Sequence, residues 1–437
     1  MELSVAVGRD GIHPKTLKSN LQIEVDRIKF RMRNGSHRFT PYRQILKVKD
    51  ANRNPRVLSV PTARDRIVLR ALMNTLNATY TLPQQERPHQ KVERIRAALD
   101  TGDYSECLRI DVVDFYPSIS HEILRKELAQ RIRKPELLTL VGRALSTPTL
   151  PDGHIKSRSP NLNGVPQGLP ISNVLAEIFM LSIDEQLAGI AGVSYFRYVD
   201  DIVILCQKDQ AGNIYARASS LLDEKNMRLH PLDTPGKTSI SPLDDEFDFL
   251  GYVFKKGKVT VRESSRHRLE NSIARVFTRY RYQLKSKSGS SRHDWNRRCT
   301  EALEWHLNLL VTGCIHNGRR HGWLHYFSQI NDTEMLKKFD LQVDRMIKKY
   351  GITGEVMPKR FTSAHWAIRC PSSRRSYIPN FDAIKTDEKR DTLYRIFSVS
   401  SRVLRTLTDD EVSHMFSAKI NKATTDLEKD IGSVYRK

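Results

Sequence analysis

The chain of 437 residues contains no run of about 18 apolar residues, which is the length that a membrane-spanning helix needs. Residues 1–18 also lack the apolar core of a signal peptide. The five cysteines are scattered and form no Cys-x-x-Cys pair, which argues against a disulfide framework. These absences predict a soluble, cytoplasmic protein that has no membrane partner.

Cysteine and histidine crowd together in one stretch, which holds Cys314, His316, His321 and His325. We expect His321 and His325 to share one face of a helix. Their spacing fits no established zinc pattern, so ordinary packing or surface histidines are the favoured interpretation. A zinc site is the alternative.

Negative charge is in deficit, because 50 Asp and Glu residues face 72 Lys and Arg residues, for a formal net charge of +22. Such an excess predicts a polyanionic partner, with nucleic acid favoured over a membrane surface. The hydrophobic content of 39% is ordinary for a globular protein, and the length allows two or three domains.

Two adjacent aspartates, Asp200 and Asp201, stand between β-branched and aromatic residues in the stretch 196–205 (Phe-Arg-Tyr-Val-Asp-Asp-Ile-Val-Ile-Leu). Runs of this kind predict two short strands joined by a turn. The strands would hold the carboxylates at a sheet edge, where they can face a cation. Taken alone, the same pair also suits an ordinary polar hairpin turn.

Four further segments make the ordinary turn improbable. Asp111 ends another apolar strand and begins Asp-Val-Val-Asp-Phe-Tyr-Pro-Ser-Ile. Residues 164–173 read Gly-Val-Pro-Gln-Gly-Leu-Pro-Ile-Ser-Asn and lead into a helix. Residues 235–238 read Pro-Gly-Lys-Thr, and residues 249–252 read Phe-Leu-Gly-Tyr.

In these five segments the chain resembles the reverse transcriptases, whose palm motifs occur in this order. The pattern is most similar to the bacterial branch of group II intron and retron enzymes. The resemblance implies an α+β, right-hand polymerase fold with fingers, a palm built on an antiparallel sheet, and a helical thumb. It also implies two Mg²⁺ ions, for which Mn²⁺ can substitute.

The resemblance assigns the metal to four residues. Asp111 and Asp200 are the expected bridging ligands, Asp201 is a weaker third ligand, and the backbone carbonyl of Val112 completes the set. Hard divalent cations prefer such oxygen ligands. Two of them can activate an attacking 3′-hydroxyl and neutralise the charge on the leaving pyrophosphate.

Further positions are expected to hold the nucleotide. Tyr116 stands where the family has its sugar gate, a ring that would collide with a ribose 2′-hydroxyl. Gln167 and Gly168 would form a turn over the nucleotide and template, with the glycine allowing close backbone approach. Lys49 and Arg56, on a predicted hairpin over 44–61, would contact the triphosphate.

The remaining motifs are expected to contact the leaving group and the nucleic acid. Lys237 is placed to protonate or stabilise pyrophosphate, and Leu250 and Gly251 would hold the primer end. Between 262 and 320 there are 13 Lys and Arg residues against 5 Asp and Glu residues. Three of the arginines fall on one helical stripe that would follow the duplex backbone: Arg268, Arg275 and Arg279.

Domain boundaries follow from these assignments. We expect an N-terminal helix and fingers over 1–99, the palm over 100–261 with further fingers segments, and a basic helical thumb over 262–350. A mostly helical element of unknown role would fill 351–437. Within this plan, hydrophobic periodicity predicts helices over these ranges: 16–31, 64–80, 173–187 and 211–227.

The C-terminal element interleaves arginines with aromatic residues, among them Arg374, Arg375, Tyr377, Tyr394 and Phe397. Folded RNA is bound by phosphate contacts and by stacking on exposed bases. This surface therefore predicts a dedicated non-coding RNA as a partner. The alternative is a helical tail that packs its aromatic rings against the thumb.

The sequence thus predicts an RNA-directed DNA polymerase that uses dNTPs and an RNA template. A stand-alone enzyme of this kind looks similar to the reverse transcriptases of bacterial antiviral defence. A retron-like or intron-type enzyme is the alternative role. The alternative functions are an RNA-binding scaffold and a template-independent nucleotidyltransferase. The oligomeric state is not predicted.

Overall fold

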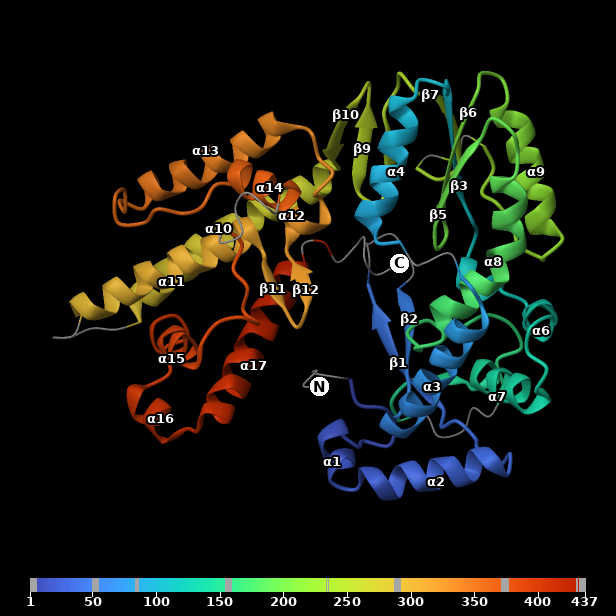
Figure 1. Cartoon of the computed structure of the whole chain (residues 1–437), viewed down its shortest axis with the longest axis horizontal. Coiled ribbons are helices and arrows are strands. Elements are labelled where there is room, and N and C mark those ends of the chain that lie inside the picture. Colours follow the sequence, from blue (N-terminus) through green and yellow to red (C-terminus); the bar gives the residue numbers. More distant parts are fainter. Residues whose placement is uncertain are drawn as a thin grey trace. The chain divides into compact units, whose positions relative to one another are not determined.

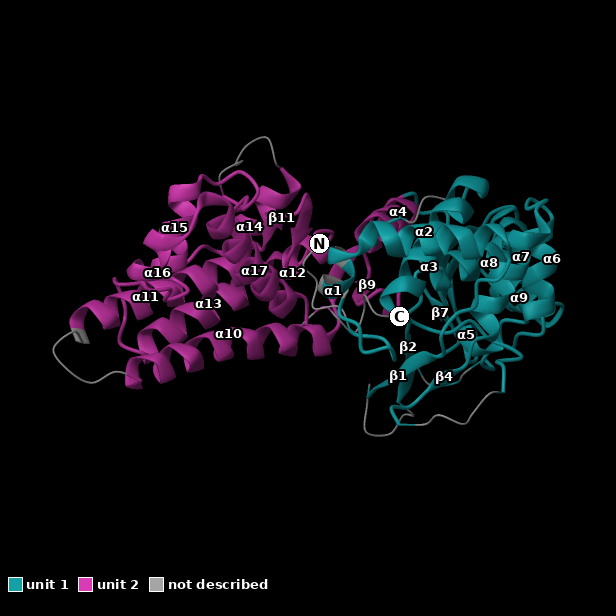
Figure 2. Cartoon of the chain, turned by 90° about the horizontal axis from the view of Figure 1, so that it is seen from below, with its two compact units in different colours: residues 1–87, 101–243 teal, residues 88–100, 244–437 magenta. Residues whose placement is uncertain are grey.

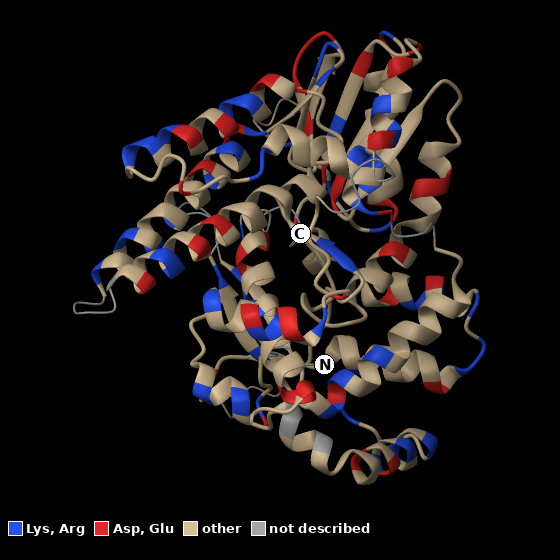
Figure 3. Ribbon diagram, turned by 60° about the vertical axis from the view of Figure 1, so that its left-hand side comes forward, with Lys and Arg blue, Asp and Glu red and all other residues tan. Residues whose placement is uncertain are grey.

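The computed structural model describes residues 6–48, 55–82, 86–153, 159–232, 234, 236–286, 292–370, 377–429 and 431 (Figure 1). The chain divides into two compact units (Figure 2). The first contains residues 1–87 and 101–243, and the second contains residues 88–100 and 244–437. Basic and acidic residues both occur along the ribbons (Figure 3). Within the described ranges, no helix is long and apolar enough to cross a bilayer.

The first unit is α+β, as predicted. Its elements are α1 (Pro14–Ser19), α2 (Leu21–Arg33), β1 (Tyr42–Lys47), β2 (Arg56–Val60), α3 (Ala63–Thr79), β3 (Glu106–Asp111), α5 (Phe115–Ser118), α6 (His121–Ala129), α7 (Pro135–Ser146), β4 (Thr149–Leu150), α8 (Ser172–Ala188), β5 (Ser194–Tyr198), β6 (Asp201–Cys206), α9 (Ala211–Asp223) and β7 (Ser239–Pro242).

An antiparallel sheet with the strand order β5-β6-β3-β7 lies at the centre of this unit. Its strands alternate, so that Leu108, Ile110, Ile202 and Ile204 all belong to the large buried core. Helices α8 and α9 supply much of the rest of that core and lie beside the sheet (Figure 1). The predicted buried helix over 173–187 is confirmed as α8, which is apolar on nearly all sides.

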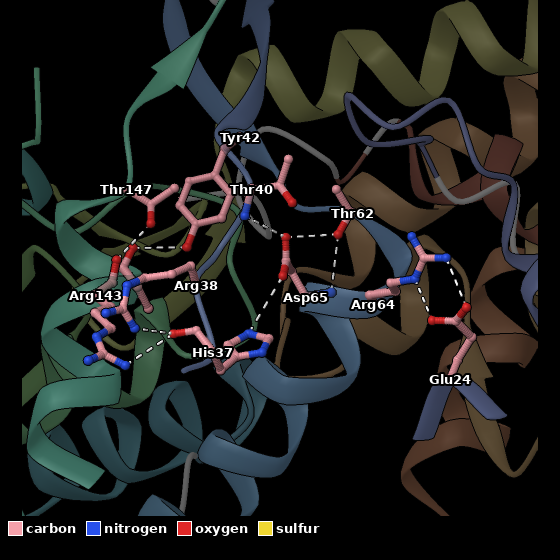
Figure 4. A network of polar contacts seen from close by, with 11 residues as sticks. Glu24, His37, Arg38, Thr40, Tyr42, Thr62, Arg64, Asp65, Arg143 and Thr147 are labelled. Atoms are coloured by element: carbon pink, nitrogen blue, oxygen red, sulfur yellow. Dashed lines mark hydrogen bonds and ion pairs between the residues drawn. The ribbon is translucent and has the colours of Figure 1, made fainter. Parts of the chain in front are cut away.

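A smaller sheet contains the predicted hairpin, in which β1 and β2 pair antiparallel and β4 adds a short parallel strand. A buried polar network fixes the hairpin to α3 (Figure 4). The Asp65 carboxylate accepts hydrogen bonds from the Thr40 amide at 3.0 Å and the Thr62 hydroxyl at 2.8 Å. The Tyr42 hydroxyl donates to the Ala144 carbonyl at 2.9 Å, which ties the hairpin to α7. Polar groups that are buried in this way need such partners.

The predicted helix over 16–31 is wrong in its extent, because the chain forms two helices, α1 and α2, that meet at Asn20. The covered face of α2 is also not purely apolar. Leu21 is 46% exposed, whereas Glu24 is buried in an ion pair with Arg64 of α3, at 2.6 Å (Figure 4). The covered face of α2 therefore combines Ile28 of the hydrophobic core with an ion pair to a residue 40 positions along the chain.

The second unit contains α4 (Pro88–Asp100), β8 (Phe247–Phe249), β9 (Tyr252–Lys255), β10 (Lys258–Val261), α10 (Glu263–Lys285), α11 (Arg292–Thr312), β11 (Cys314–His316), β12 (Arg319–His321), α12 (Trp323–Tyr326), α13 (Thr333–Lys349), α14 (Phe361–Arg369), α15 (Thr386–Arg395), α16 (Ser401–Thr406) and α17 (Asp409–Glu428). It is mainly helical, with one three-stranded antiparallel sheet and one hairpin of two short strands.

The expectation that His321 and His325 share a helix face is wrong, because His321 ends β12 and His325 lies in α12. His321 instead contacts Glu428 of α17 at 2.6 Å. Among the residues that the structure describes, no group of three His, Cys, Asp or Glu side chains could hold a metal ion. The zinc alternative therefore finds no support in these ranges.

Aromatic residues of the C-terminal element contact side chains of α11, and Tyr394 and Phe397 are half-buried there. Tyr394 lies under the Arg298 guanidinium at 4.0 Å, and the rings of Phe397 and Phe381 contact Trp305 at 5.4 and 6.0 Å. These contacts favour the packing alternative for these rings, and stacking on RNA stays a prediction. Arg374 and Arg375 lie outside the described residues.

Candidate active site

Two of the predicted catalytic carboxylates belong to directly paired residues. Asp111 ends β3 and lies opposite Asp201, the first residue of β6. Directly opposite residues of an antiparallel pair have Cα atoms about 4.5–5.5 Å apart. Asp200 stands one residue earlier, in the two-residue turn that joins β5 to β6. Three aspartates thus meet at one end of the central sheet, which is the arrangement that the strand pattern predicted.

Asp111 is held from two sides by the segment before β7. The ammonium group of Lys237 lies 2.5 Å from Asp111 Oδ2, and both side chains are largely buried. The next residue, Thr238, is fully buried, and its hydroxyl accepts a hydrogen bond from the Asp111 amide at 3.3 Å. Lys237 therefore sits at the aspartate cluster, although 126 residues separate it from Asp111.

The oxygen donors of this cluster suit a hard divalent cation. Carboxylates are the ligands that Mg²⁺ prefers, and the Lys237 ammonium shows that a cation fits against Asp111. Within the described ranges, however, Asp111, Asp200 and Asp201 do not converge into a ready-made cluster of three metal ligands. Val112 is buried and pairs by a β-bridge with Leu229. Metal binding by these residues stays a prediction.

The predicted sugar gate, Tyr116, lies in α5 immediately beyond the aspartates and is 8% exposed. Its hydroxyl donates to Asn173 Oδ1, near the start of α8, at 2.8 Å. Burial, and next the negative charge of Asp200, raises the pKa of Tyr116 above its usual value. The phenol is therefore protonated at neutral pH and acts as a hydrogen-bond donor to Asn173.

The predicted turn over the nucleotide is joined to the β1–β2 hairpin. The Gln167 carbonyl accepts a hydrogen bond from the Ser59 amide of β2 at 2.7 Å. Gly168 has φ +103°, and a Cβ atom there would lie 3.0 Å from the Ser59 carbonyl oxygen. A side chain at this position is thus disfavoured both by conformation and by space.

The other predicted residues belong to the β1–β2 hairpin or to the second unit. Arg56 begins β2 opposite Lys47, on the hairpin of the first unit, and Lys49 lies outside the described residues. Leu250 and Gly251 are buried in the second unit, in the turn between β8 and β9. The three predicted thumb arginines lie on α10 of that unit: Arg268, Arg275 and Arg279. Their contacts with nucleotide, primer and duplex stay predictions.

The sequence interpretation missed a buried ionic group beneath the aspartate turn. Arg197 of β5 lies between two carboxylates of α8, those of Glu177 and Asp184. Two signals pointed to it: an arginine inside an apolar strand, and acidic residues seven positions apart, Glu177 and Asp184, in a mostly apolar helix. The local sequence did not indicate that Arg197 would pair with Glu177 and Asp184.

Comparison with known proteins identifies the domain that carries this cluster. The family model described as "Reverse transcriptase (RNA-dependent DNA polymerase)" matches residues 45–254, which include all three aspartates. Residues 45–254 are a reverse transcriptase domain. The match confirms the predicted family and enzyme class, and with it the polymerase fold of this part of the chain.

Two curated relatives agree with this family. The protein YkfC of Escherichia coli K12 is 26% identical over 292 residues, which span 56% of this chain and 74% of that protein. An uncharacterized 91 kDa protein in the cob intron of Schizosaccharomyces pombe is 27% identical over 183 residues, or 40% of this chain and 22% of that protein. The intron origin of the second relative agrees with the predicted intron and retron branch.

Solved structures with a similar chain trace include two yeast telomerases. Apo telomerase from Candida tropicalis has a TM-score of 0.42 and 12% identity, over 91% of this chain and 68% of that one. Telomerase from Candida albicans, in complex with a telomeric RNA fragment, has a TM-score of 0.41 and 12% identity, over 90% and 68%. At scores this low we base nothing further on them.

Proposed function

We propose that the chain is an active polymerase that copies RNA into DNA with two divalent ions, Mg²⁺ by preference, at the Asp111, Asp200 and Asp201 cluster. One observation carries the proposal: two paired strands, and the turn that leads into one of them, bring three aspartates to one end of the sheet, inside a reverse transcriptase domain. An RNA-binding scaffold would gain nothing from such a concentration of like charge, because adjacent carboxylates repel each other.

In this proposal the three aspartates, with the Val112 carbonyl, hold the ions. Two bound divalent ions supply activation of the 3′-hydroxyl and neutralisation of the leaving pyrophosphate. Lys237 begins in contact with Asp111 and is long enough to turn toward a phosphate oxygen, where its charge would stabilise the leaving group. Because the ammonium is also a proton donor, it can act as the general acid.

The product is proposed to be DNA because of Tyr116. Its ring is packed edge-to-face against Phe115, with centroids 5.3 Å apart, and its hydroxyl is fixed by Asn173. A ring held in two ways has little freedom to move aside for a ribose 2′-hydroxyl. The turn of Gln167 and Gly168, which is hydrogen-bonded to β2, would cover the bound nucleotide.

The biological role and the RNA partner are the finer part of the proposal. We retain a dedicated non-coding RNA and a role in antiviral defence as the working assignment. The net charge of +22 supports a nucleic-acid partner, and the defence role rests on the family resemblance alone. The described aromatic rings of the C-terminal element give no support, because they contact side chains of α11.

The test is primer extension by the purified chain on an RNA template with a DNA primer, dNTPs and Mg²⁺. We expect extension that stops when a chelator is added and returns with Mg²⁺ or Mn²⁺. Asp111→Ala should abolish it, because this carboxylate is the proposed bridging ligand. An Asp111→Ala protein that extends the primer at the wild-type rate would show the site assignment to be wrong.

A further inference from the structure

Arg197 has every one of its donors engaged beneath the aspartate turn. Its side chain is 5% exposed. Nε and Nη2 donate to the two oxygens of Asp184 at 2.7 and 2.5 Å, and Nη1 and Nη2 donate to the two oxygens of Glu177 at 3.2 and 2.7 Å. The remaining Nη1 hydrogen reaches the Val199 carbonyl at 3.0 Å. An arginine has five N–H groups, and this set uses all of them.

The fifth bond is the informative one, because Val199 is the first residue of the aspartate turn. Its carbonyl belongs to the peptide group that also carries the Asp200 nitrogen. The direction of this carbonyl therefore sets the direction in which Asp200 leaves the turn. Val199 has φ +59°, a left-handed conformation that a β-branched residue adopts only under constraint.

The ionic network of Arg197, Glu177 and Asp184 is held both by helix α8 and by strand β5. Glu177 and Asp184 stand two turns apart on α8, the helix that begins just beyond the Gln167–Gly168 turn. The Tyr195 hydroxyl donates to Asp184 Oδ1 at 2.7 Å, which fixes that carboxylate further. Isolated buried ions are costly, whereas fully hydrogen-bonded groups of this kind hold one geometry.

We propose that Arg197 is a positioning residue that fixes the Val199–Asp200 turn, so that Asp200 and Asp201 present their carboxylates to a divalent ion. This inference rests on the proposed function. Groups that orient metal ligands from behind change metal affinity by roughly 10–100-fold when they are replaced. A residue that only holds α8 to the sheet would change stability and leave the affinity of the folded protein unchanged.

The experiment measures Mn²⁺ binding to the chain by electron paramagnetic resonance, without nucleic acid, at a temperature where each variant is folded by circular dichroism. Arg197→Lys keeps the charge but cannot form both two-oxygen contacts and reach Val199. We expect it to bind Mn²⁺ roughly 10–100-fold more weakly than wild type. Primer extension by this variant should recover as Mn²⁺ is raised.

Lys225 provides a matched control. It is also a buried cation against α8, with its ammonium 2.8 Å from Glu127 and 2.6 Å from the Phe179 carbonyl, and both of these partners lie outside the aspartate turn. Lys225→Met should lower stability and leave the Mn²⁺ affinity at the wild-type value. Equal weakening in both variants would overturn the proposal, because it would indicate a general loosening of α8.

A folded Arg197→Lys protein that binds Mn²⁺ as tightly as wild type would also overturn it. If Arg197→Lys does not fold, Glu177→Gln is the second variant. This change keeps the shape but removes one charge from the network, and we expect affinity to fall several-fold; unchanged affinity would again overturn the proposal. If the Asp200→Ala variant binds Mn²⁺ as tightly as the wild-type chain, the proposed function is overturned, and this inference with it.

Discussion

Two hairpin turns of this molecule share their length but differ in what holds them. The turn between β5 and β6 consists of Val199 and Asp200, and the turn between β8 and β9 consists of Leu250 and Gly251. In each, the first residue is not glycine and has a left-handed conformation, with φ +59° at Val199 and +52° at Leu250. Two-residue hairpins require such angles, because these match the twist of the strands.

The supports differ in chemical type. The Leu250 carbonyl accepts a hydrogen bond from the Tyr326 hydroxyl at 2.9 Å, and Tyr326 is packed among Tyr252 and Phe327. Leu250 itself is buried. The Val199 carbonyl is held instead by a buried guanidinium.

The guanidinium is itself paired with Glu177 and Asp184, so it adds no net positive charge beneath the aspartates, but its planar set of donors fixes the direction of the Val199 carbonyl. We infer that the support of the first turn serves to orient the aspartates for catalysis. The support of the second turn serves the stability of its unit.

The largest expected effect is a loss of primer extension when Asp200 loses its charge but keeps its size. Asp200→Asn keeps the size of the side chain and should leave the midpoint of thermal unfolding nearly unchanged. It removes a proposed metal ligand, so the rate of RNA-templated extension should fall by at least roughly 10³-fold.

Asp209→Asn is the control, because Asp209 is an exposed turn residue with φ +65° at the far end of β6. The same change there should leave extension at the wild-type rate. Comparable losses in both variants would remove the special role given to Asp200.

Next in size is the choice of sugar. Tyr116→Ala opens space beside the aspartates, and we expect the ratio of ribonucleotide to deoxyribonucleotide incorporation to rise roughly 10–100-fold, the discrimination typical of a site that excludes one hydroxyl. Tyr116→Phe keeps the ring and loses only the bond to Asn173, so its ratio should stay near that of wild type. An Ala variant with the wild-type ratio would exclude Tyr116 as the gate.

Acid should weaken the unit that contains the Leu250 turn. Burial lowers the pKa of His306 and of His325 to about 3, whereas the unfolded chain titrates near 6.5. Because the unfolded chain binds a proton at each histidine near pH 6.5 and the folded chain does not, protonation favours the unfolded state. The unfolding free energy is therefore highest above pH 6.5 and decreases as the pH falls toward 3. Between pH 6.5 and 5 this amounts to about 2 kcal/mol for each histidine.

Tryptophan fluorescence reports this unit alone, since all four tryptophans lie between residues 295 and 366. Urea unfolding followed at pH 7 and pH 5 should show the loss, and His306→Gln should reduce it. An unfolding free energy that is equal at the two pH values would contradict the assigned burial of these histidines.

How much of this could be predicted depends on whether a feature is local. The hairpin around Asp200 and Asp201, the strand that ends at Asp111 and the buried helix α8 were predicted correctly, because side-chain period and turn chemistry determine them within a few residues. The placement of Lys237 against Asp111 agrees with the motif order.

Tertiary pairing could not be predicted in the same way. The burial of Glu24 depends on Arg64, and the bonds of Arg197 depend on a helix that ends nine residues earlier and a turn that follows. The sequence predicted that the aromatic rings of the C-terminal element stack on RNA, but Tyr394 and Phe397 contact Arg298 and Trp305 of α11. Charge and aromatic content alone do not distinguish a binding surface from an interface inside the molecule.

The smallest expected effect concerns the turn between β8 and β9. Gly251 has φ +83°, so Gly251→Ala should lower the unfolding free energy of the second unit by about 1–2 kcal/mol. Lys256, in the exposed turn between β9 and β10, has φ +45°, and Lys256→Gly relieves strain there and should not destabilise. Urea unfolding followed by fluorescence measures both. An Ala variant as stable as wild type would mean that the turn is not constrained as described.

The most direct test of the whole account is the product that the wild-type chain makes. The purified protein is given a DNA primer on an RNA template, with Mg²⁺ and all four dNTPs, and the extended strand is sequenced. The account predicts DNA complementary to the RNA and no extension when the template is omitted. Extension by a sequence unrelated to the template, or none at all with either metal, would contradict it.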